Sequence, residues 1–250
     1  MAAIGPGCAS MPERLKCAEG EVHVWRLLPG ASAALLDGLA GLLDEEELAR
    51  AARFVRQVER DEYIATRGAL RILLSRYLGT DAGAIRFGRA PNGKPVLEAG
   101  TRTDDIRFSV AHSGGAAVLA VASATETGVD LEQVRPGLAT ASIALRYFRP
   151  DEVERLAGLS REAYDEAFLR CWTRLEARLK LSGRGLVALG SVDADHDEAC
   201  TVHDLDPAPG FVGALAVQGR VRRIVCRDIP TAWLAQSASV ATPGIEHDAR

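Results

Sequence analysis

The sequence contains no apolar run that approaches the ~20 residues needed to cross a bilayer as a helix. Its first ten residues, MAAIGPGCAS, have neither the basic segment nor the apolar stretch of a secretory signal. These absences exclude the usual routes into or across a membrane. We therefore expect a cytoplasmic protein with no membrane partner.

Excess positive charge is also missing, since the formal net charge is -4 at pH 7. A protein that binds nucleic acid through bulk charge is therefore not expected. The cysteines, Cys8, Cys17, Cys171, Cys200 and Cys226, are odd in number and form no Cys-x-x-Cys pair. They predict reduced thiols, and they give no support for a cysteine nucleophile.

Lysine is scarce, because only Lys16, Lys94 and Lys180 occur and arginine supplies the remaining permanent positive charge. Where arginine is the default, a lysine can mark a position that needs a compact ammonium group, although chance explains any single one. Two of the three lysines fall inside the motifs described below.

What is present is an ordinary globular composition, with 250 residues, 47% hydrophobic and 26% charged. A chain of this length buries a substantial core as one large domain or two small ones. Periodicity, caps and turn residues predict strands at 20–27, 84–97 (as a strand pair), 106–122 (a second pair, around Gly114-Gly115), 128–132 and 211–229 (a third pair, around Gln218-Gly219). They predict helices at 43–56, at 60–79 with Gly79 as C-cap, and over 140–182 with a break at Arg149-Pro150.

Helices and antiparallel hairpins in both halves predict an α+β protein with two similar lobes. The polar, turn-rich stretch 98–105 is the expected boundary. It divides the chain into an N-terminal lobe at 12–104 and a C-terminal lobe at 105–235. Residues 1–11 and 237–250 are expected to be flexible tails.

The stretch TGVDLEQV, residues 127–134, alternates apolar and acidic residues. As a strand it turns Val129 and Leu131 to one face, and Asp130 and Glu132 to the other, about 7 Å apart along the chain. The two carboxylates repel each other, and partial burial increases the repulsion. Something positive is expected between them.

A helix further along the chain offers matching groups. Trp172, Glu176 and Lys180 are spaced four residues apart and share one face. Taken alone, this pattern is more often a solvated ion pair beside a core tryptophan. Joined with Asp130 and Glu132, Glu176 makes an all-oxygen anionic site that suits Mg²⁺, or equally Mn²⁺. Lys180 is then placed to hold a phosphate oxygen, and metal plus lysine is typical of phosphoryl transfer.

Two further motifs indicate phosphate binding. GRAPNGKPVL places Arg89, Asn92 and Lys94 around a tight turn, and SVAHSGG places His112 and Ser113 beside two glycines whose amides can face an anion. The alternatives are a plain turn for the first motif and a hydrogen-bonded core histidine for the second.

The motifs NGKP, FSVAHSGG, GVDLE and WTRLEARLK occur in this order. Together they resemble the 4′-phosphopantetheinyl transferases of the surfactin-synthetase-activator (Sfp) type, over about Arg50 to Lys180. The resemblance implies two pseudo-twofold-related α+β lobes with coenzyme A between them, in a chain expected to act as a monomer. It also implies that coenzyme A gives its phosphopantetheine arm to a serine of an apo acyl or peptidyl carrier protein, with release of 3′,5′-ADP.

The resemblance further implies roles for individual residues. Asp130, Glu132 and Glu176 are expected to hold Mg²⁺. Glu176 is the first choice of general base and Glu132 the second. Lys180 is expected to contact the pyrophosphate. The residues expected to bind coenzyme A are Arg50 (or Arg53 in its place), Arg89, Asn92, Gly93, Lys94, Ser109, His112, Ser113, Glu176 and Lys180.

One position departs from the family pattern, since Leu175 stands where a lysine is usual. Arg174 or Arg178 would have to compensate, and we expect reduced or altered activity. The alternative is a non-catalytic protein that binds coenzyme A. The carrier is expected to dock on residues 134–150, whose arginines suit an acidic helix; a merely solvated segment is the alternative.

A serine hydrolase is a more remote reading of AHSGG, which is similar to a nucleophile elbow. A helix should follow such a turn, but a strand is predicted here. His112 and Ser113 are adjacent, so on a strand they point apart. The sequence does not identify the carrier, which belongs to polyketide, peptide or fatty-acid synthesis.

Overall fold

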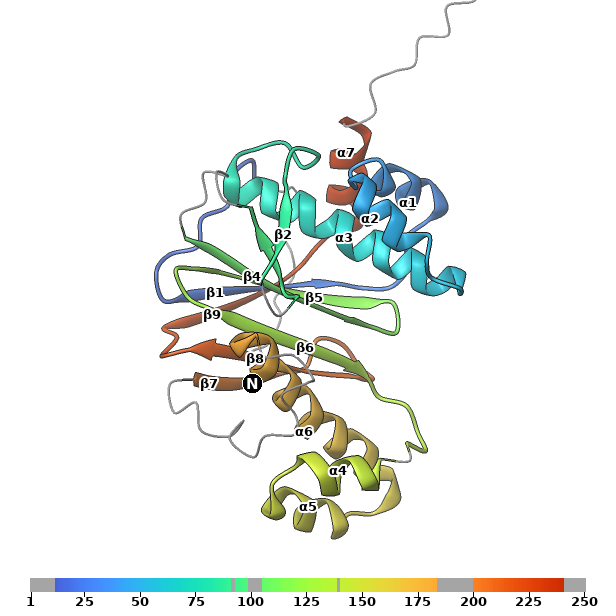
Figure 1. Ribbon diagram of the computed structural model, residues 1–250, viewed down its shortest axis with the longest axis vertical. Coiled ribbons are helices and arrows are strands. Elements are labelled where there is room, and N and C mark those ends of the chain that lie inside the picture. The colour runs from blue at the N-terminus through green and yellow to red at the C-terminus, as the bar shows by residue number, and fades with distance from the viewer. Residues whose placement is uncertain (1–11, 91–92, 99–104, 139, 184–199, 241–250) are drawn as a thin grey trace, which may run out of the picture.

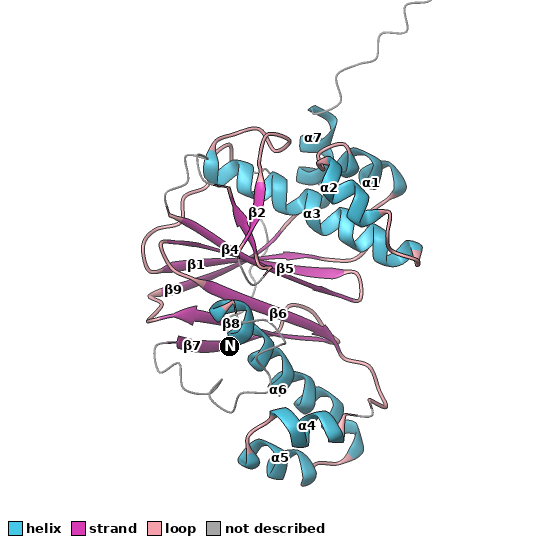
Figure 2. Ribbon diagram, in the orientation of Figure 1, coloured by secondary structure: helices cyan, strands magenta, loops and turns pink. Residues whose placement is uncertain are grey.

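The computed structural model describes residues 12–90, 93–98, 105–138, 140–183 and 200–240. It has two main sheets stacked face to face, with helices on both outer sides (Figure 1, Figure 2). Helices α1, α2, α3 and α7 lie above the first sheet in Figure 1, and α4, α5 and α6 lie on the side of the second. The α+β class expected from the sequence is confirmed.

The first sheet has the strand order β4-β5-β1-β9. Its strands are β4 (Ile106–Ser113), β5 (Ala116–Ser123), β1 (Glu21–Leu27) and β9 (Arg223–Asp228). β5 pairs antiparallel with β4 and β1, whereas β1 and β9 are parallel. In β5, Leu119 and Val121 pack with the helices, and Val118 and Ala120 pack with the second sheet. Burial on both faces explains the unbroken apolar run of β5.

The second sheet is antiparallel in the order β6-β8-β7. Its strands are β6 (Thr127–Gln133), β8 (Phe211–Gln218) and β7 (Cys200–Leu205). On β8, Leu215 and Val217 join the core between the sheets, while Ala214 and Ala216 pack with α6 (Arg161–Ser182). Small alanines on that face let the helix approach closely.

The remaining elements follow the local signals. Helices α1 (Ala33–Ala40), α2 (Glu45–Ala51), α3 (Gln57–Leu78) and α7 (Thr231–Val240) belong to the first side, with the short strands β2 (Phe87–Arg89) and β3 (Pro95–Leu97). On the other side, α4 (Ala141–Tyr147) and α5 (Pro150–Ala157) are separated at Pro150, as expected, because proline suits the first turn of a helix. Both α3 and α6 have 22 residues and end at a left-handed glycine, Gly79 and Gly183.

Two expectations are wrong. The strands at 211–229 exist but form no hairpin, because β8 joins the second sheet and β9 pairs with β1 in the first. Residues 237–240 are helical, not a tail, since Ala238 is buried against Gly38 of α1. The small residues near position 238, which were expected to form a flexible tail, instead allow α7 to lie close to α1. Residues 1–11 and 241–250 lie outside the described residues.

The expected boundary at 98–105 falls mostly outside the described residues. The first sheet takes β1 from before this stretch, and β4, β5 and β9 from after it. A division at residue 104 therefore does not separate the two sheets. In the structure each sheet instead packs with a long helix of its own, α3 or α6.

Gly128 of β6 sets the distance between this strand and α6. A Cβ atom at this position would overlap the carbonyl oxygen of Ala177 and the amide nitrogen of Leu181. Both are backbone atoms of α6, so no side-chain rotation can relieve the overlap. Glycine at residue 128 is therefore what lets the helix backbone lie directly on the strand.

We predict that Gly128→Ala lowers the free energy of unfolding by about 1–3 kcal/mol, because overpacking forces the helix away from the strand. Urea denaturation followed by circular dichroism measures the change. Gly158→Ala is the control, since the nearest atom to its new Cβ lies at an ordinary 3.6 Å. Equal stability of the two variants would contradict the tight contact.

Candidate active site

The acidic stretch of β6 faces α6. Val129 and Leu131 are buried in the core between the sheets, and the alternation of the strand turns Asp130 and Glu132 to the opposite face with Gly128. The carboxylates are therefore brought beside the helix by the same close approach that Gly128 permits. This arrangement confirms the faces expected from the sequence.

Lys180 of α6 provides positive charge at the acidic face. Its Nζ lies 2.7 Å from Oδ1 of Asp130, a residue only 4% exposed. The other oxygen, Oδ2, is buried and has no partner in normal hydrogen-bond geometry among the described residues. Burial raises the pKa of Asp130, while the charge of Lys180 and the neighbouring amide of Leu131 oppose this shift.

Glu176 lies one turn before Lys180 and is coupled to the same acids. Burial raises the pKa of Glu176 to about 7, with the charges of Asp130 and Glu132 adding to the shift and Lys180 opposing it. Burial also raises the pKa of Glu132, Asp130 adds to it, and a hydrogen bond from Ser113 opposes it. Burial raises the pKa of all three carboxyls, and neighbouring acids add to the shift for Glu132 and Glu176, so a proton or cation stabilises the group.

His112 lies on β4 at the edge of this group. Its Nδ1 is 3.8 Å from Oε2 of Glu62 on α3. Burial lowers the pKa of His112, with Lys180 and Arg50 adding to the shift and Glu62 and Asp130 opposing it. The side chain is still 41% exposed, so solvent moderates the effect of burial.

A cavity of about 560 Å³ opens beside His112 and is lined by Arg50, Arg89 and several aromatic rings, including Phe87. An adjoining hollow of about 380 Å³ is lined by Arg50, Arg53 and Arg89. The structure thus brings together Arg50, Arg89 and His112, as expected, and keeps the fallback residue Arg53 close by. A second cavity, of about 930 Å³ and lined by both apolar and charged residues, also borders His112 and contacts Ser113.

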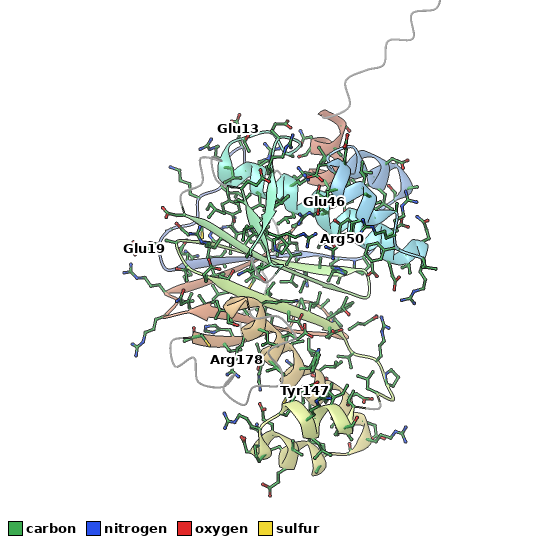
Figure 3. The ribbon with its side chains drawn as sticks, in the orientation of Figure 1. Glu13, Glu19, Glu46, Arg50, Tyr147 and Arg178 are labelled. Carbon is green, nitrogen blue, oxygen red and sulfur yellow. The ribbon has the colours of Figure 1, made fainter. Side chains whose placement is uncertain are left out.

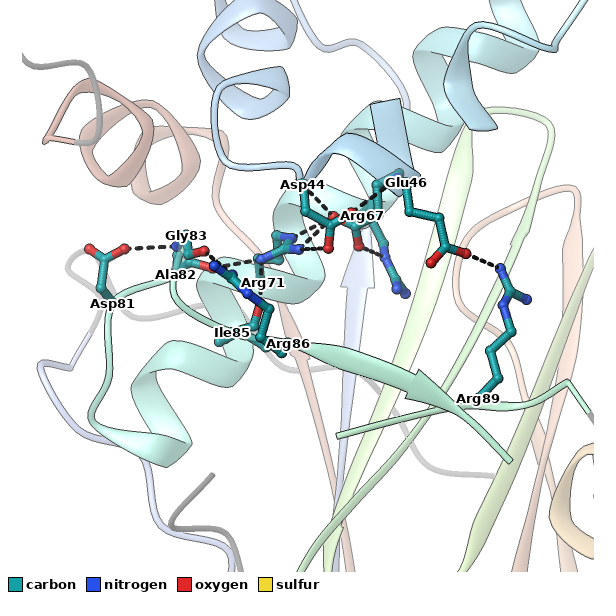
Figure 4. A network of polar contacts seen from close by, with 11 residues as sticks. Asp44, Glu46, Arg67, Arg71, Asp81, Ala82, Gly83, Ile85, Arg86 and Arg89 are labelled. Atoms are coloured by element: carbon teal, nitrogen blue, oxygen red, sulfur yellow. Dashed lines mark hydrogen bonds and ion pairs between the residues drawn. The ribbon is translucent and has the colours of Figure 1, made fainter. Parts of the chain in front are cut away.

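A buried arginine network, drawn in Figure 4, fixes the wall of the 560 Å³ cavity. Arg71 of α3 is fully buried and contacts Asp44 at 2.8 Å and Glu47 at 2.6 Å, while Arg67 also pairs with Glu47. Asp44 and Glu47 form the capping box of α2, the helix that carries Arg50.

Sequence reasoning missed this network, although two signals for it were readable. The pattern Asp-x-x-Glu at 44–47 is a capping box, and two arginines four residues apart on α3 share a face. Along the cavity edge, Glu46 of α2 lies 3.4 Å from Arg89, which connects the helix to β2 (Figure 4). The two proposed phosphate-binding arginines are thus held by one framework.

Other expected coenzyme contacts lie elsewhere. Lys94 is 3.0 Å from Glu126 and 2.9 Å from the carbonyl oxygen of Thr127, where it joins the turn after β2 to the start of β6. Gly93 adopts the left-handed conformation at φ 84° that the turn requires. Ser109 is buried, and its hydroxyl accepts a hydrogen bond from the amide of Val129. Asn92 lies outside the described residues.

Arg174 gives no support for the proposed compensation of Leu175, because its guanidinium makes two hydrogen bonds, at 2.7 and 2.5 Å, to Asp204 on β7. Figure 3 places Arg178 on α6 and Tyr147 on α4, both in the lower part of the molecule, whereas Arg50 lies among the upper helices. Arg50 and helix α6, which carries Glu176 and Lys180, therefore come from opposite sides of the two-sheet core.

The alternative chemistries lose support. A strand, β5, follows Ser113, and its hydroxyl is hydrogen-bonded to Glu132 at 2.8 Å, so a nucleophile elbow is excluded. The described cysteines are free thiols, and burial raises the pKa of Cys17, Cys171 and Cys226, which disfavours a thiolate. Of the helices described, none is both long and apolar enough to span a membrane.

The expected metal site is not preassembled. Within the described ranges, no three histidine, cysteine, aspartate or glutamate side chains lie close enough together to hold a metal ion. The donor set nevertheless fits a hard cation, because it consists of buried or half-buried carboxylates with raised pKa values and includes the unpartnered Oδ2 of Asp130.

Comparison with known proteins places these features in one family. Residues 31–124 match the family described as 4′-phosphopantetheinyl transferase, N-terminal, and residues 126–233 match the 4′-phosphopantetheinyl transferase superfamily. The join between these two regions falls just before β6, some twenty residues after the boundary expected from the sequence.

Individual relatives agree. The 4′-phosphopantetheinyl transferase HetI of a Nostoc species is 34% identical over 83% of this chain and 92% of its own length. AcpT of Salmonella typhi is 32% identical over 65% of this chain and 78% of its own, and psf-1 of Bacillus pumilus is 28% identical over 69% and 78%. The chain therefore belongs to the 4′-phosphopantetheinyl transferase superfamily.

Proposed function

We propose that this chain transfers the 4′-phosphopantetheine arm of coenzyme A to a serine hydroxyl of an apo carrier protein. The serine oxygen forms a bond to the phosphorus next to the pantetheine, and the bond from that phosphorus to the bridging oxygen breaks, which releases 3′,5′-ADP. The observation that carries the proposal is the cluster of Asp130, Glu132, Glu176 and Lys180. It lies beside a cavity with Arg50, Arg89 and His112 on its wall.

Asp130, Glu132 and Glu176 are the residues that would hold Mg²⁺ or Mn²⁺. Carboxylate oxygens are the preferred ligands of both ions, and the mutual repulsion of the three acids favours a cation. When bound, the ion would neutralise charge on the pyrophosphate and on the phosphoryl group that is being transferred.

The other residues act directly on coenzyme A. The ammonium group of Lys180, which contacts Asp130, would bind the pyrophosphate next to the acidic residues. Arg50 and Arg89, on the cavity wall, would bind the nucleotide end with its 3′-phosphate. His112, which contacts both cavities, lies between the nucleotide and the pantetheine arm. Holding the phosphates in place is itself catalytic, because phosphoryl transfer depends mainly on positioning and charge.

Glu176 is the proposed general base. In the metal-free protein its pKa is about 7, so near neutral pH part of the population is ionised and can accept a proton, and a bound cation would increase that part. Glu132 is the second choice, since its pKa is also raised. The order of the motifs favours the surfactin-synthetase-activator type within the superfamily.

The carrier protein is proposed to dock on residues 134–150, beside the end of β6. Leu145 on α4 is 73% exposed, and Arg146 and Arg149 flank it. An exposed apolar side chain with two arginines near it in the sequence suits an acidic helix with an apolar face, which is the surface expected of an acyl or peptidyl carrier. A monomer in the cytoplasm remains our expectation.

Incubation with coenzyme A, Mg²⁺ and an apo carrier tests the function, because transfer raises the mass of the carrier by one phosphopantetheine group. We expect this gain with the natural chain, and a loss of at least about a hundredfold in rate with Asp130→Asn, which removes a charged ligand. Coenzyme A binding without any gain in mass would favour the second candidate, a non-catalytic binder. Leu175→Lys then shows whether the missing lysine is the cause.

Stability should depend on pH through Glu176. Its pKa is about 7 in the folded protein against 4.5 for an ordinary glutamate, so between these values the folded state holds more protons than the unfolded state. The free energy of unfolding therefore falls as pH rises from about 4.5 to about 7. Without divalent metal, Glu176→Gln should be more stable than the natural chain above pH 7. Thermal melting in chelator across this pH range is the measurement, and identical curves would contradict the raised pKa.

Arg50 and Arg89 should govern the binding of coenzyme A more than the chemical step. We predict that Arg50→Ala and Arg89→Ala each raise KM for coenzyme A about tenfold and change kcat less than threefold, because each removes a charge-assisted hydrogen bond to phosphate. Arg220→Ala, an exposed position on the loop after β8, is the matched control. A fall in kcat with KM unchanged would place these arginines at the reacting phosphorus instead.

A further inference from the structure

Two serine hydroxyls join the two sheets. Strands β4 and β6 lie side by side in different sheets, and backbone hydrogen bonds do not define a ladder between them. The amide of Val129 donates to Oγ of Ser109 at 3.0 Å, and the amide of Gln133 donates to Oγ of Ser113 at 3.1 Å. Both pairs are four residues apart on their strands, so the strands run in the same direction. The hydroxyls thus act as the acceptors that backbone carbonyls provide inside a sheet.

The two serines differ in one respect. Ser113 Oγ also donates a hydrogen bond to Oε2 of Glu132, at 2.8 Å. A hydroxyl has a single hydrogen, so with the amide of Gln133 donating to its oxygen, that hydrogen is committed to the carboxylate. Ser109 accepts the same kind of hydrogen bond, from the amide of Val129, but it is buried between the two sheets, where it is 5% exposed.

The hydrogen bond opposes a repulsion. Glu132 is half-buried on the same strand face as Asp130. Burial and the charge of Asp130 both disfavour the ionised form of Glu132. The charges of Lys180 and Arg135 favour that form, but each has a smaller effect than burial. A half-buried glutamate repelled from one side can turn toward solvent. The bond from Ser113 holds one of its oxygens at the seam instead.

The turn after β4 fixes Ser113 itself. Gly114 adopts the left-handed conformation at φ 58°, and a Cβ atom there would overlap the side chain of Gln133. The turn therefore lies directly against the end of β6. The close turn fixes the backbone beside Ser113, and the two hydrogen bonds of its hydroxyl, to Glu132 and from the amide of Gln133, hold the side chain.

We propose that Ser113 is a positioning residue, which orients Glu132 within the acidic site rather than contacting coenzyme A. The inference rests on the proposed function and replaces the expectation that this hydroxyl binds the coenzyme. Ser113 acts through Glu132, so its removal should affect the metal and the chemical step, and leave coenzyme binding intact.

The matched pair Ser113→Ala and Ser109→Ala tests the proposal, because each variant loses one amide contact at the seam and only the first loses the carboxylate contact. We expect kcat to fall about tenfold more in Ser113→Ala than in Ser109→Ala, with KM for coenzyme A within about twofold of the natural chain. Ser113→Thr, which keeps the hydroxyl, should restore most of the lost kcat. Thermal melting confirms that both alanine variants are folded.

Titration with Mn²⁺ alone, followed by electron paramagnetic resonance, gives a second readout without turnover. Ser113→Ala should bind Mn²⁺ about tenfold more weakly than Ser109→Ala. Equal Mn²⁺ affinity and equal kcat in the two variants would show that Ser113 only joins the sheets, which overturns the proposal. A rise in KM for coenzyme A with kcat preserved would also overturn it, in favour of direct contact.

The same data separate this proposal from the proposed function. A natural chain that modifies no apo carrier, while Mn²⁺ affinity still differs between the two variants, removes the transferase function and leaves the positioning role. If the natural chain modifies the carrier but the two variants have equal kcat and equal Mn²⁺ affinity, the transferase function stands and the positioning role of Ser113 is removed.

Discussion

The direct contact between the backbone of α6 and strand β6 at Gly128 is the constraint on which the candidate site depends. It brings Lys180 into contact with Asp130 and puts Glu176, one turn earlier on the same helix, within electrostatic reach of Asp130 and Glu132 in a partly desolvated region. In water such a grouping has little effect on any pKa, because the charges are screened. Here burial is the largest cause of each raised carboxyl pKa, and burial is a consequence of how near the helix lies.

The arginine-lined cavity beside His112 is organised by a different principle. The 560 Å³ cavity is lined by acids as well as arginines, since Asp44, Glu46 and Glu47 all contribute to its wall. Arg71 and Arg67 neutralise two of these acids from the interior, and Arg89 faces the third. The framework that fixes α2 is therefore nearly balanced in charge. Arg50, at the end of the same helix, gains its position from this framework rather than from a local excess of positive charge.

The parts of the fold that follow from local periodicity could be predicted from the sequence. Alternation fixed the faces of Asp130 and Glu132, and spacing by four placed Glu176 with Lys180, because both patterns report geometry within one element. The partner of β9 could not be predicted in this way, since a strand signal does not say which edge it will join. Lys94 shows the same limit: its turn was recognised, but its ion pair with Glu126 depends on how two distant segments meet. The contact of Ser113 with Glu132 likewise exists only across the seam between sheets.

The parallel pairing of β9 with β1 has a consequence for synthesis in the cell. About two hundred residues separate the two strands, so the first sheet lacks one edge until nearly all of the described chain has left the ribosome. Helix α7, which packs its Trp233 on Trp25 of β1, arrives later still. Co-translational folding should therefore yield a nascent chain with an open β1 edge, and contacts of such high sequence separation close slowly. During that interval the unpaired N–H and C=O groups of β1 can pair with a strand of another chain, so this edge is the expected starting point for aggregation.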